Sequence, residues 1–277
     1  MKFLYVSLGF LLLLTMNTST TFGQVLPSGA EAAGVGFATV SLDGKMGVWR
    51  NPAGLAKTKS QQLMVGCQNR YGLAEGLNTV HTAYIHPMAS SVAAVSFYRM
   101  GDAIYSHHVL GLSLGHRVNQ FQGGLRINQL QFSMEGADTR YALSIDAGVV
   151  ATLSSQLGMG IQINNVNRAK VSNQTDERIP TQIAIGFDYK PDKQINVLGE
   201  LAYEISSSPF LKVGMTYQPL PYLTFRSGVN TSEQARMFLG FGLRHRVLHL
   251  DYALETHPVL GISQHFGLAY QIRSDAE

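Results

Sequence analysis

The sequence predicts an all-β protein: a transmembrane antiparallel β-barrel of about 14 strands with an N-terminal plug inside its lumen. From Gln61 onward, the chain repeats segments of about eight to twelve residues in which apolar residues alternate with polar or small ones. Charged residues make up 14% of the chain, whereas a soluble domain has roughly 25%. Beyond the N-terminus, no apolar run approaches the ~20 residues that a spanning helix needs. A low charge content without such a helix favours a barrel that crosses the membrane with strands.

The first 23 residues predict a secretory signal peptide. Lys2 gives a positive start, the run from Phe3 to Met16 is mostly apolar, and Gly23 is a small residue at the expected cleavage point. The apolar run is shorter than the ~20 residues of a membrane-spanning helix. We therefore expect an exported protein whose mature chain begins at Gln24 and which resides in the outer membrane.

Alternation is clearest in the C-terminal half of the chain. The segments 157–164, 182–189 and 248–255 each have one apolar face and one face of polar or small residues. Turn-forming residues separate such segments, for example Pro191-Asp192-Lys193. The strands of a soluble β-sandwich also alternate, but a sandwich places polar residues on its water-facing side and rarely keeps its charge so low. The barrel is therefore the favoured fold.

In a membrane barrel, the apolar residues face lipid and the polar residues face the lumen. Outer-membrane lipid is thus an expected partner of the outer face. The polar residues expected to point inward are Asp146, Asp188, Glu200, Glu204, Lys212, Arg226, Arg236, Arg244, His249, Asp251 and Glu255. Phe238 interrupts this polar face. Glycines at other inward positions leave room for a second segment, and they include Gly158, Gly160, Gly186, Gly214, Gly228, Gly240, Gly242 and Gly267.

Residues 24–60 are predicted to form the plug. Small residues allow a chain to pack tightly without regular pairing, and Asn-Pro followed by Ala-Gly forces a turn. The motif positions are Gly29, Ala30, Gly34, Gly36, Asn51, Pro52, Ala53 and Gly54. The predicted division of the chain is therefore a signal peptide (1–23), a plug (24–60) and a barrel (61–277), and the plug predicts a barrel that is closed at rest.

Two motifs placed ahead of the strands carry a family resemblance. Ala30 to Ala38 reads Ala-Glu-Ala-Ala-Gly-Val-Gly-Phe-Ala, and Asn51 to Leu55 reads Asn-Pro-Ala-Gly-Leu. Together with the signal peptide and the strands, they resemble the FadL-type outer-membrane barrels, and the first motif is most similar to the PorV and PorQ barrels of the type IX secretion system. Those relatives usually carry Arg where this chain has Glu31, and their acidic pair between the motifs is reduced to Asp43-Gly44-Lys45. We therefore expect this plug to contact its barrel differently.

The resemblance implies two functions. FadL-type barrels pass hydrophobic compounds across the outer membrane by way of a hydrophobic pocket and a hatch, whereas PorV-like barrels are accessory subunits of a secretion complex. The chain allows about fifteen residues per strand and turn, and the strand alone needs ~9 to 11, so little is left for capture loops. We therefore favour an accessory subunit of a secretion or cell-surface assembly, partnered by other outer-membrane or surface proteins. The alternative is a FadL-like transporter that binds a hydrophobic ligand or lipid.

The sequence gives little support to catalysis, metal binding or nucleic-acid binding. The clustered candidates for a nucleophile are Ser106, His107, His108 and Ser113, and no third orienting residue accompanies them. His245, His249 and Asp251 straddle a predicted turn and lack a fourth metal ligand. The formal net charge of +3 is too balanced to indicate nucleic acid. We therefore predict a noncatalytic protein without a cofactor or metal.

Tyrosines are expected at the membrane interface, where an amphipathic ring is stable. They are Tyr84, Tyr98, Tyr189, Tyr203, Tyr217, Tyr252 and Tyr270. A sugar-stacking track is the alternative interpretation of the same residues.

Overall fold

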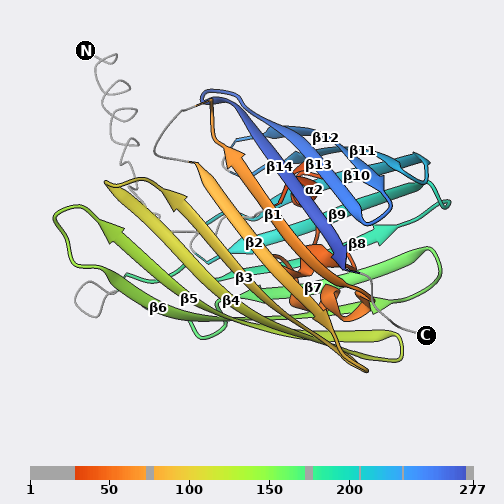
Figure 1. Ribbon diagram of the computed structural model, residues 1–277, viewed down its shortest axis with the longest axis horizontal. Coiled ribbons are helices and arrows are strands. Elements are labelled where there is room, and N and C mark those ends of the chain that lie inside the picture. The colour runs from red at the N-terminus through yellow and green to blue at the C-terminus, as the bar shows by residue number, and fades with distance from the viewer. Residues whose placement is uncertain (1–28, 73–77, 172–176, 206, 233, 273–277) are drawn as a thin grey trace, which may run out of the picture.

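The computed structural model is a closed barrel of fourteen antiparallel strands (Figure 1). Each strand pairs with its neighbours in the chain, and β1 closes the barrel by pairing with β14. The structure describes residues 29–72, 78–171, 177–205, 207–232 and 234–272. The expected signal peptide and residues 24–28 of the expected plug lie outside these residues. The predicted fold class is confirmed.

The strands follow one another around the wall without a crossover. They are β1 (Gln61–Asn69), β2 (Thr79–Pro87), β3 (Ser91–Gly101), β4 (Tyr105–Val118), β5 (Phe121–Met134), β6 (Arg140–Thr152), β7 (Leu157–Asn164), β8 (Gln182–Tyr189), β9 (Ile195–Glu204), β10 (Phe210–Leu220), β11 (Leu223–Asn230), β12 (Arg236–His245), β13 (Leu248–His257) and β14 (Gly261–Ile272). The longest connection, 165–181, joins β7 to β8 at what we call the loop end. β1 begins and β14 ends at the opposite end, which we call the turn end.

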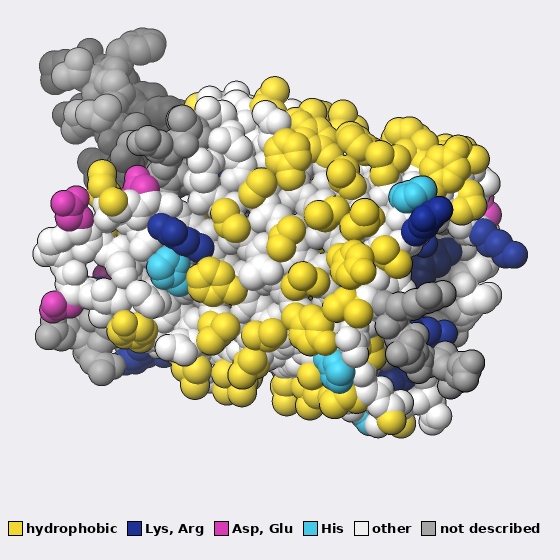
Figure 2. Space-filling model, in the orientation of Figure 1, with side chains coloured by type: hydrophobic (Ala, Val, Ile, Leu, Met, Phe, Trp, Pro, Cys, Tyr) yellow, Lys and Arg dark blue, Asp and Glu magenta, His cyan; other side chains and the backbone are white. Residues whose placement is uncertain are grey.

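The outer face of the barrel is apolar because the strands alternate. Along β10, Leu211 and Val213 are 53% and 52% exposed, whereas Lys212 between them is 3% exposed. Hydrophobic side chains spread over the middle of the barrel, and charged side chains lie toward its two ends (Figure 2). This surface has the character of a bilayer-facing band.

The expectation for the tyrosines is wrong at Tyr98. The other six lie on outward positions of their strands, but Tyr98 is 3% exposed. Every second residue at this end of β3 is buried, namely Ser96, Tyr98 and Met100, so Tyr98 faces the lumen. The position of Tyr98 in this alternation, rather than its residue type, decides which way it faces.

Residues 29–60, which we call the inner segment, lie inside the barrel (Figure 1). The inner segment contains α2 (Ala30–Gly34) and two 3₁₀ helices, η1 (Lys45–Val48) and η2 (Pro52–Lys57). None of the helices among the described residues is long and apolar enough to span a membrane.

Apolar side chains bind the inner segment to the wall. Phe37 packs edge-on against Phe238 of β12, with ring centroids 5.5 Å apart. Phe238 is thus inward, and its interruption of the polar face supplies a packing contact for the inner segment. Trp49 packs in the same manner on His81 of β2 at 4.8 Å.

Glycines in the wall allow the inner segment to approach the strands closely. A Cβ on Gly115 would lie 2.9 Å from the Ala56 nitrogen, and a Cβ on Gly124 would overlap the backbone of Pro52 and Ala53. Of the predicted inward glycines, Gly160, Gly186, Gly214, Gly228, Gly240 and Gly267 face the inner segment. Gly158 instead faces Asp188, and Gly242 faces Asp251 and Arg226.

We predict that Gly124→Val displaces the inner segment, because the new side chain would overlap its backbone and overpacking costs about 1–3 kcal/mol or more. Trp49 is the only tryptophan in the chain, so its fluorescence reports the displacement. Gly123→Val is the matched control, since a Cβ on this exposed neighbour meets nothing within 4 Å. Identical Trp49 emission in the two variants would contradict the close approach.

Candidate functional site: a lumen divided by the inner segment

Two cavities lie on opposite sides of the inner segment. The loop-end cavity has a volume of about 660 Å³, and Trp49 and Arg50 of the inner segment line its floor. The turn-end cavity has a volume of about 520 Å³ and is lined by Glu31, Lys45 and Lys57 of the same segment. The inner segment therefore separates a space at each mouth of the barrel.

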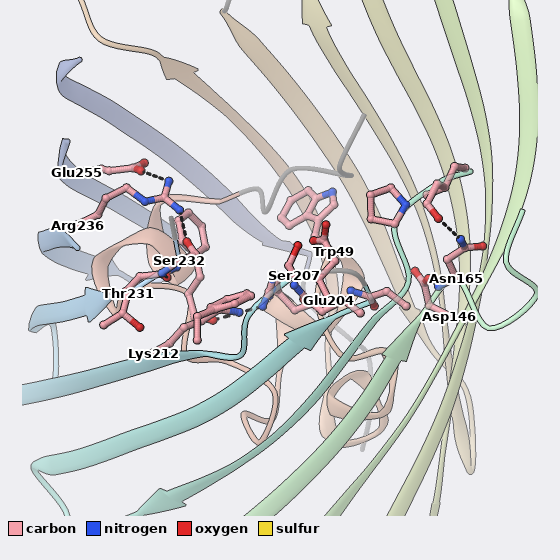
Figure 3. A pocket seen from close by; sticks show the side chains of 18 of the residues that line it. Trp49, Asp146, Asn165, Glu204, Ser207, Lys212, Thr231, Ser232, Arg236 and Glu255 are labelled. Atoms are coloured by element: carbon pink, nitrogen blue, oxygen red, sulfur yellow. Dashed lines mark hydrogen bonds and ion pairs between the residues drawn. The ribbon is translucent and has the colours of Figure 1, made fainter. Parts of the chain in front are cut away.

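The loop-end cavity has a mixed lining (Figure 3). Arg236 donates hydrogen bonds to Glu255 (2.8 Å) and Ser232 (2.6 Å) on one side, and Asp146 and Asn165 lie on the other. The apolar side chains among the lining residues are Phe37, Trp49, Tyr71, Ile179, Pro180, Pro209 and Phe210. Such a lining suits a compound with both apolar and polar parts better than a pure hydrocarbon.

Glu200 on β9 is the main ionic anchor of the inner segment. Its carboxylate accepts hydrogen bonds from the backbone N–H groups of Thr39 (2.9 Å) and Val40 (3.0 Å). Lys212 of β10 pairs with the other oxygen, and Arg50 of the inner segment lies 3.6 Å from it. Glu200 and its four partners are all buried. A buried carboxylate with this many donors is fully compensated and holds the inner segment in one position.

A second anchor joins η1 to β5 and β6. Arg126 donates to Asp146 through Nε (2.9 Å) and Nη2 (2.6 Å), and its Nη1 donates to the Val48 carbonyl (2.9 Å). Asn128 also donates to Asp146 at 2.8 Å. The last turn of η1, whose carbonyl would otherwise lack a partner, is thereby bound to the wall.

The Asn-Pro-Ala-Gly motif forms the start of η2. The Asn51 side chain accepts from the Ala53 N–H (3.1 Å) as a helix cap, and Pro52 occupies the first turn, where its missing N–H costs nothing. A side chain on Gly54 would overlap the Leu42 carbonyl. The motif thus builds a tight, capped turn.

Asn51 also connects this turn to the wall. Its amide donates to the Val40 carbonyl (2.6 Å) within the inner segment and approaches the Ile161 carbonyl of β7 at 3.3 Å. A Cβ on Gly148 of β6 would overlap the Asn51 side chain, so this amide fits only beside a glycine.

The first motif surrounds α2. Gly29 and Gly36 have φ angles of 104° and 64°, which favour glycine. A Cβ on Gly34 would lie 3.0 Å from Arg226 Cβ, and a Cβ on Gly36 would lie 3.0 Å from the Val229 nitrogen. Ala30, buried in α2, faces Gly267 of β14. The small residues therefore allow α2 to lie directly on the wall.

Glu31 and Lys45 belong to a third anchor, at the turn end. Lys45 pairs with Glu31 (3.0 Å) and with Asp251 of β13 (3.1 Å), and Arg226 of β11 pairs with Asp251 at 2.9 Å. Burial by itself raises the pKa of Glu31, but Lys45 and Arg226 outweigh burial and lower this pKa to about 2. Glu31 of the first motif and Lys45 of the Asp43-Gly44-Lys45 stretch are thus charge partners of each other.

The remaining predicted lumen residues are distributed along the wall. Asp188 pairs with Lys190 at 2.8 Å, and Glu204 lines the loop-end cavity. Arg244 and His249 line the turn-end cavity, with Arg244 at its exposed rim. These residues do not gather into one centre.

The side chains considered for catalysis do not converge either. On β4, His107 and Ser113 lie on inward positions, whereas Ser106 and His108 lie on outward ones. Among the described residues, no group of three or more His, Cys, Asp or Glu side chains is arranged to hold a metal ion. Asp251, considered as a ligand, is instead occupied by Arg226 and Lys45.

Comparison with known proteins shows the fold. The sequence matches no protein-family model and no curated protein. Solved structures do match. The toluene transporter TodX of Pseudomonas putida superposes with a TM-score of 0.71 at 10% identity, covering 90% of this chain and 100% of TodX. The deltaS2 mutant of the TodX monoaromatic hydrocarbon channel gives 0.73 at 10% identity, with 91% and 100% covered.

A FadL homologue of Pseudomonas aeruginosa gives a TM-score of 0.61 at 13% identity, covering 89% of this chain and 98% of that one. The chain therefore has the fold of the FadL-type outer-membrane channels.

We predict that Glu200→Gln loosens the inner segment, because Arg50 and Lys212 would lose their buried counter-charge. Breaking such a pair costs about 3 kcal/mol or more, which corresponds to an exchange rate roughly 100-fold faster at locally opening amides. Hydrogen exchange at Thr39 and Val40 measures this. Asp188→Asn is the control, since Asp188 pairs with Lys190 outside the inner segment. Unchanged exchange at Thr39 and Val40 would show that Glu200 is not an anchor.

We predict a pH dependence at the turn end. The pKa of Glu31 is about 2 in the folded protein against an ordinary value of 4.5, so its stabilising contribution is present above pH 4.5 and disappears as the pH falls toward 2. Glu31→Gln should therefore destabilise the inner segment at pH 7 and have little effect at pH 2. Urea titrations followed by Trp49 fluorescence test this, and an equal difference at both pH values would contradict it.

Proposed function

We propose that this protein transports hydrophobic small molecules across the outer membrane. The observation that carries the proposal is an inner segment that fills the middle of a FadL-type barrel and leaves one cavity at each mouth. Such an arrangement provides an entrance, a barrier and an exit. The fold similarity to the toluene transporter TodX spans 90% of the chain and supports the same function. We further infer that the signal peptide exports the chain to the outer membrane, where lipid covers the apolar band.

Transport requires part of the inner segment to move. Three ionic anchors hold it at rest, and wall glycines bring it into backbone contact with the strands. The barrel is therefore closed in the described state, and a passage opens only when some of these contacts break.

An accessory subunit of a type IX secretion system, similar to PorV or PorQ, is a second candidate. The short connections favour it: most are a few residues long, and the longest spans 165–181. A barrel with little mass outside the membrane can present its wall to another outer-membrane or surface protein. Isolation in mild detergent distinguishes the candidates, because an accessory subunit leaves the membrane together with its partner.

Uptake measurements test the transport proposal. Deletion of the gene should lower the uptake of at least one compound from a panel of radiolabelled toluene, p-cresol and long-chain hydrocarbons, and the wild-type chain should restore it. Wild-type uptake of every compound by the deletion strain would overturn the proposal.

A reversible cross-link tests whether the inner segment moves. Ala30 Cβ lies 3.6 Å from the position of a Cβ on Gly267, which suits a disulfide. We predict that Ala30→Cys/Gly267→Cys loses uptake when oxidised and regains it after reduction, because the disulfide fixes α2 to β14. Each single cysteine variant is a control for the substitutions themselves. Full uptake by the oxidised protein would show that α2 stays in place during transport.

A further inference from the structure

One sector of the inner wall at the loop end is aromatic and apolar. On β3, β4 and β5, the inward residues Tyr98, Met100, Val109, Leu130 and Phe132 form a buried cluster. His107 lies among them and has 0% exposure. Its ring stacks on Phe132 with centroids 4.4 Å apart and planes inclined by 12°, and Tyr98 meets its edge at 5.9 Å. We call these six residues the wall cluster.

His107 is the unusual member of the wall cluster. Within the described part of the chain, neither of its ring nitrogens has a hydrogen-bond partner. An imidazole contains at least one N–H donor, and a buried donor or acceptor without a partner costs about 1–3 kcal/mol. Native proteins rarely keep such a group without a reason, and one reason is a ligand that supplies the missing partner.

Three residues of the β7–β8 connection, Ala169, Val171 and Ile179, pack on the wall cluster. Of these three, Ile179 also lines the loop-end cavity, so it lies between the cluster and the cavity. The Ile179 backbone is fixed, because its N–H donates to the Ala169 carbonyl (3.0 Å) and its carbonyl accepts from Asn165 Nδ2 (2.7 Å). Ile179 is therefore the residue at which the wall cluster and the loop-end cavity adjoin.

We propose that the wall cluster is a binding subsite for a small aromatic compound that carries one hydroxyl group, entered from the loop-end cavity past Ile179. The ring of the ligand packs among Tyr98, Phe132 and the apolar side chains, where aromatic surfaces prefer stacked or edge-on contacts. Its hydroxyl pairs with a nitrogen of His107, which is otherwise unsatisfied. The proposal rests on the proposed transport function and specifies a substrate class for it.

Binding of p-cresol and toluene to the purified full-length chain in detergent tests the proposal, because the two compounds differ by one hydroxyl. Calorimetry should show that the wild type binds p-cresol about tenfold more tightly than toluene, as expected for one added hydrogen bond to a buried group. His107→Phe keeps a stacking ring and removes both nitrogens, so it should abolish this preference while toluene binding persists. His108→Phe changes the outward neighbour on the same strand and should preserve the preference.

Ile179→Ala provides a second measurement that does not depend on His107 variants folding. Removing the separating side chain should strengthen p-cresol binding several-fold. The proposal is wrong if the wild type does not prefer p-cresol, if His107→Phe retains the preference, or if Ile179→Ala leaves p-cresol binding unchanged. Toluene binding or uptake without a hydroxyl preference would overturn this inference alone, whereas failure of the deletion strain to lose uptake of any compound would overturn transport as well.

Discussion

The buried carboxylate of Glu200 is the interaction on which the arrangement of the lumen depends. The inner segment has only short helices, so much of its backbone lacks internal partners, and a buried N–H without a partner is costly. Glu200 satisfies two such groups, at Thr39 and Val40, and is the shared counter-charge of Arg50 and Lys212. An irregular chain can therefore fill a barrel only where the wall supplies hydrogen-bonding partners at matching positions.

The glycines of the wall allow the inner segment to lie close enough to reach these hydrogen-bonding partners. Side chains at Gly124 or Gly160 would overlap the backbone of the inner segment and hold it away from the wall groups that bind it. Asn51 illustrates the dependence, since its amide reaches a wall carbonyl only because position 148 lacks a side chain. The ionic anchors and the wall glycines thus depend on each other, and a change to either weakens the attachment of the inner segment to the wall.

The sequence predicts the barrel well because a period of two is local information. Strands such as β7 and β8 have the predicted bounds, and inward polar residues follow from alternation. The sequence does not predict which groups those inward residues bind. Thr39 and Glu200, for example, are 161 positions apart, and their pairing depends on closure of the barrel. For the same reason the sequence does not identify Arg50 and Arg126 as anchors, although the alternation of 121–134 indicates that Arg126 faces inward. Tyr98 faces the lumen although tyrosine is common at membrane interfaces, because its position in the alternation of β3 decides which way it points.

The distribution of charges also determines which displacements of the inner segment are least costly. Two ion pairs are internal to the segment, Glu31 with Lys45 and Asp43 with Lys57 at 2.6 Å, and both lie at the turn end. A movement of this half keeps both pairs intact, and Arg226 and Asp251 on the wall remain paired with each other. A movement at Glu200 would instead leave a buried carboxylate and buried cations to find new partners, which costs several kcal/mol. The turn-end half is therefore the part that can separate from the wall without creating an unpaired buried charge, while the Glu200 anchor stays in place.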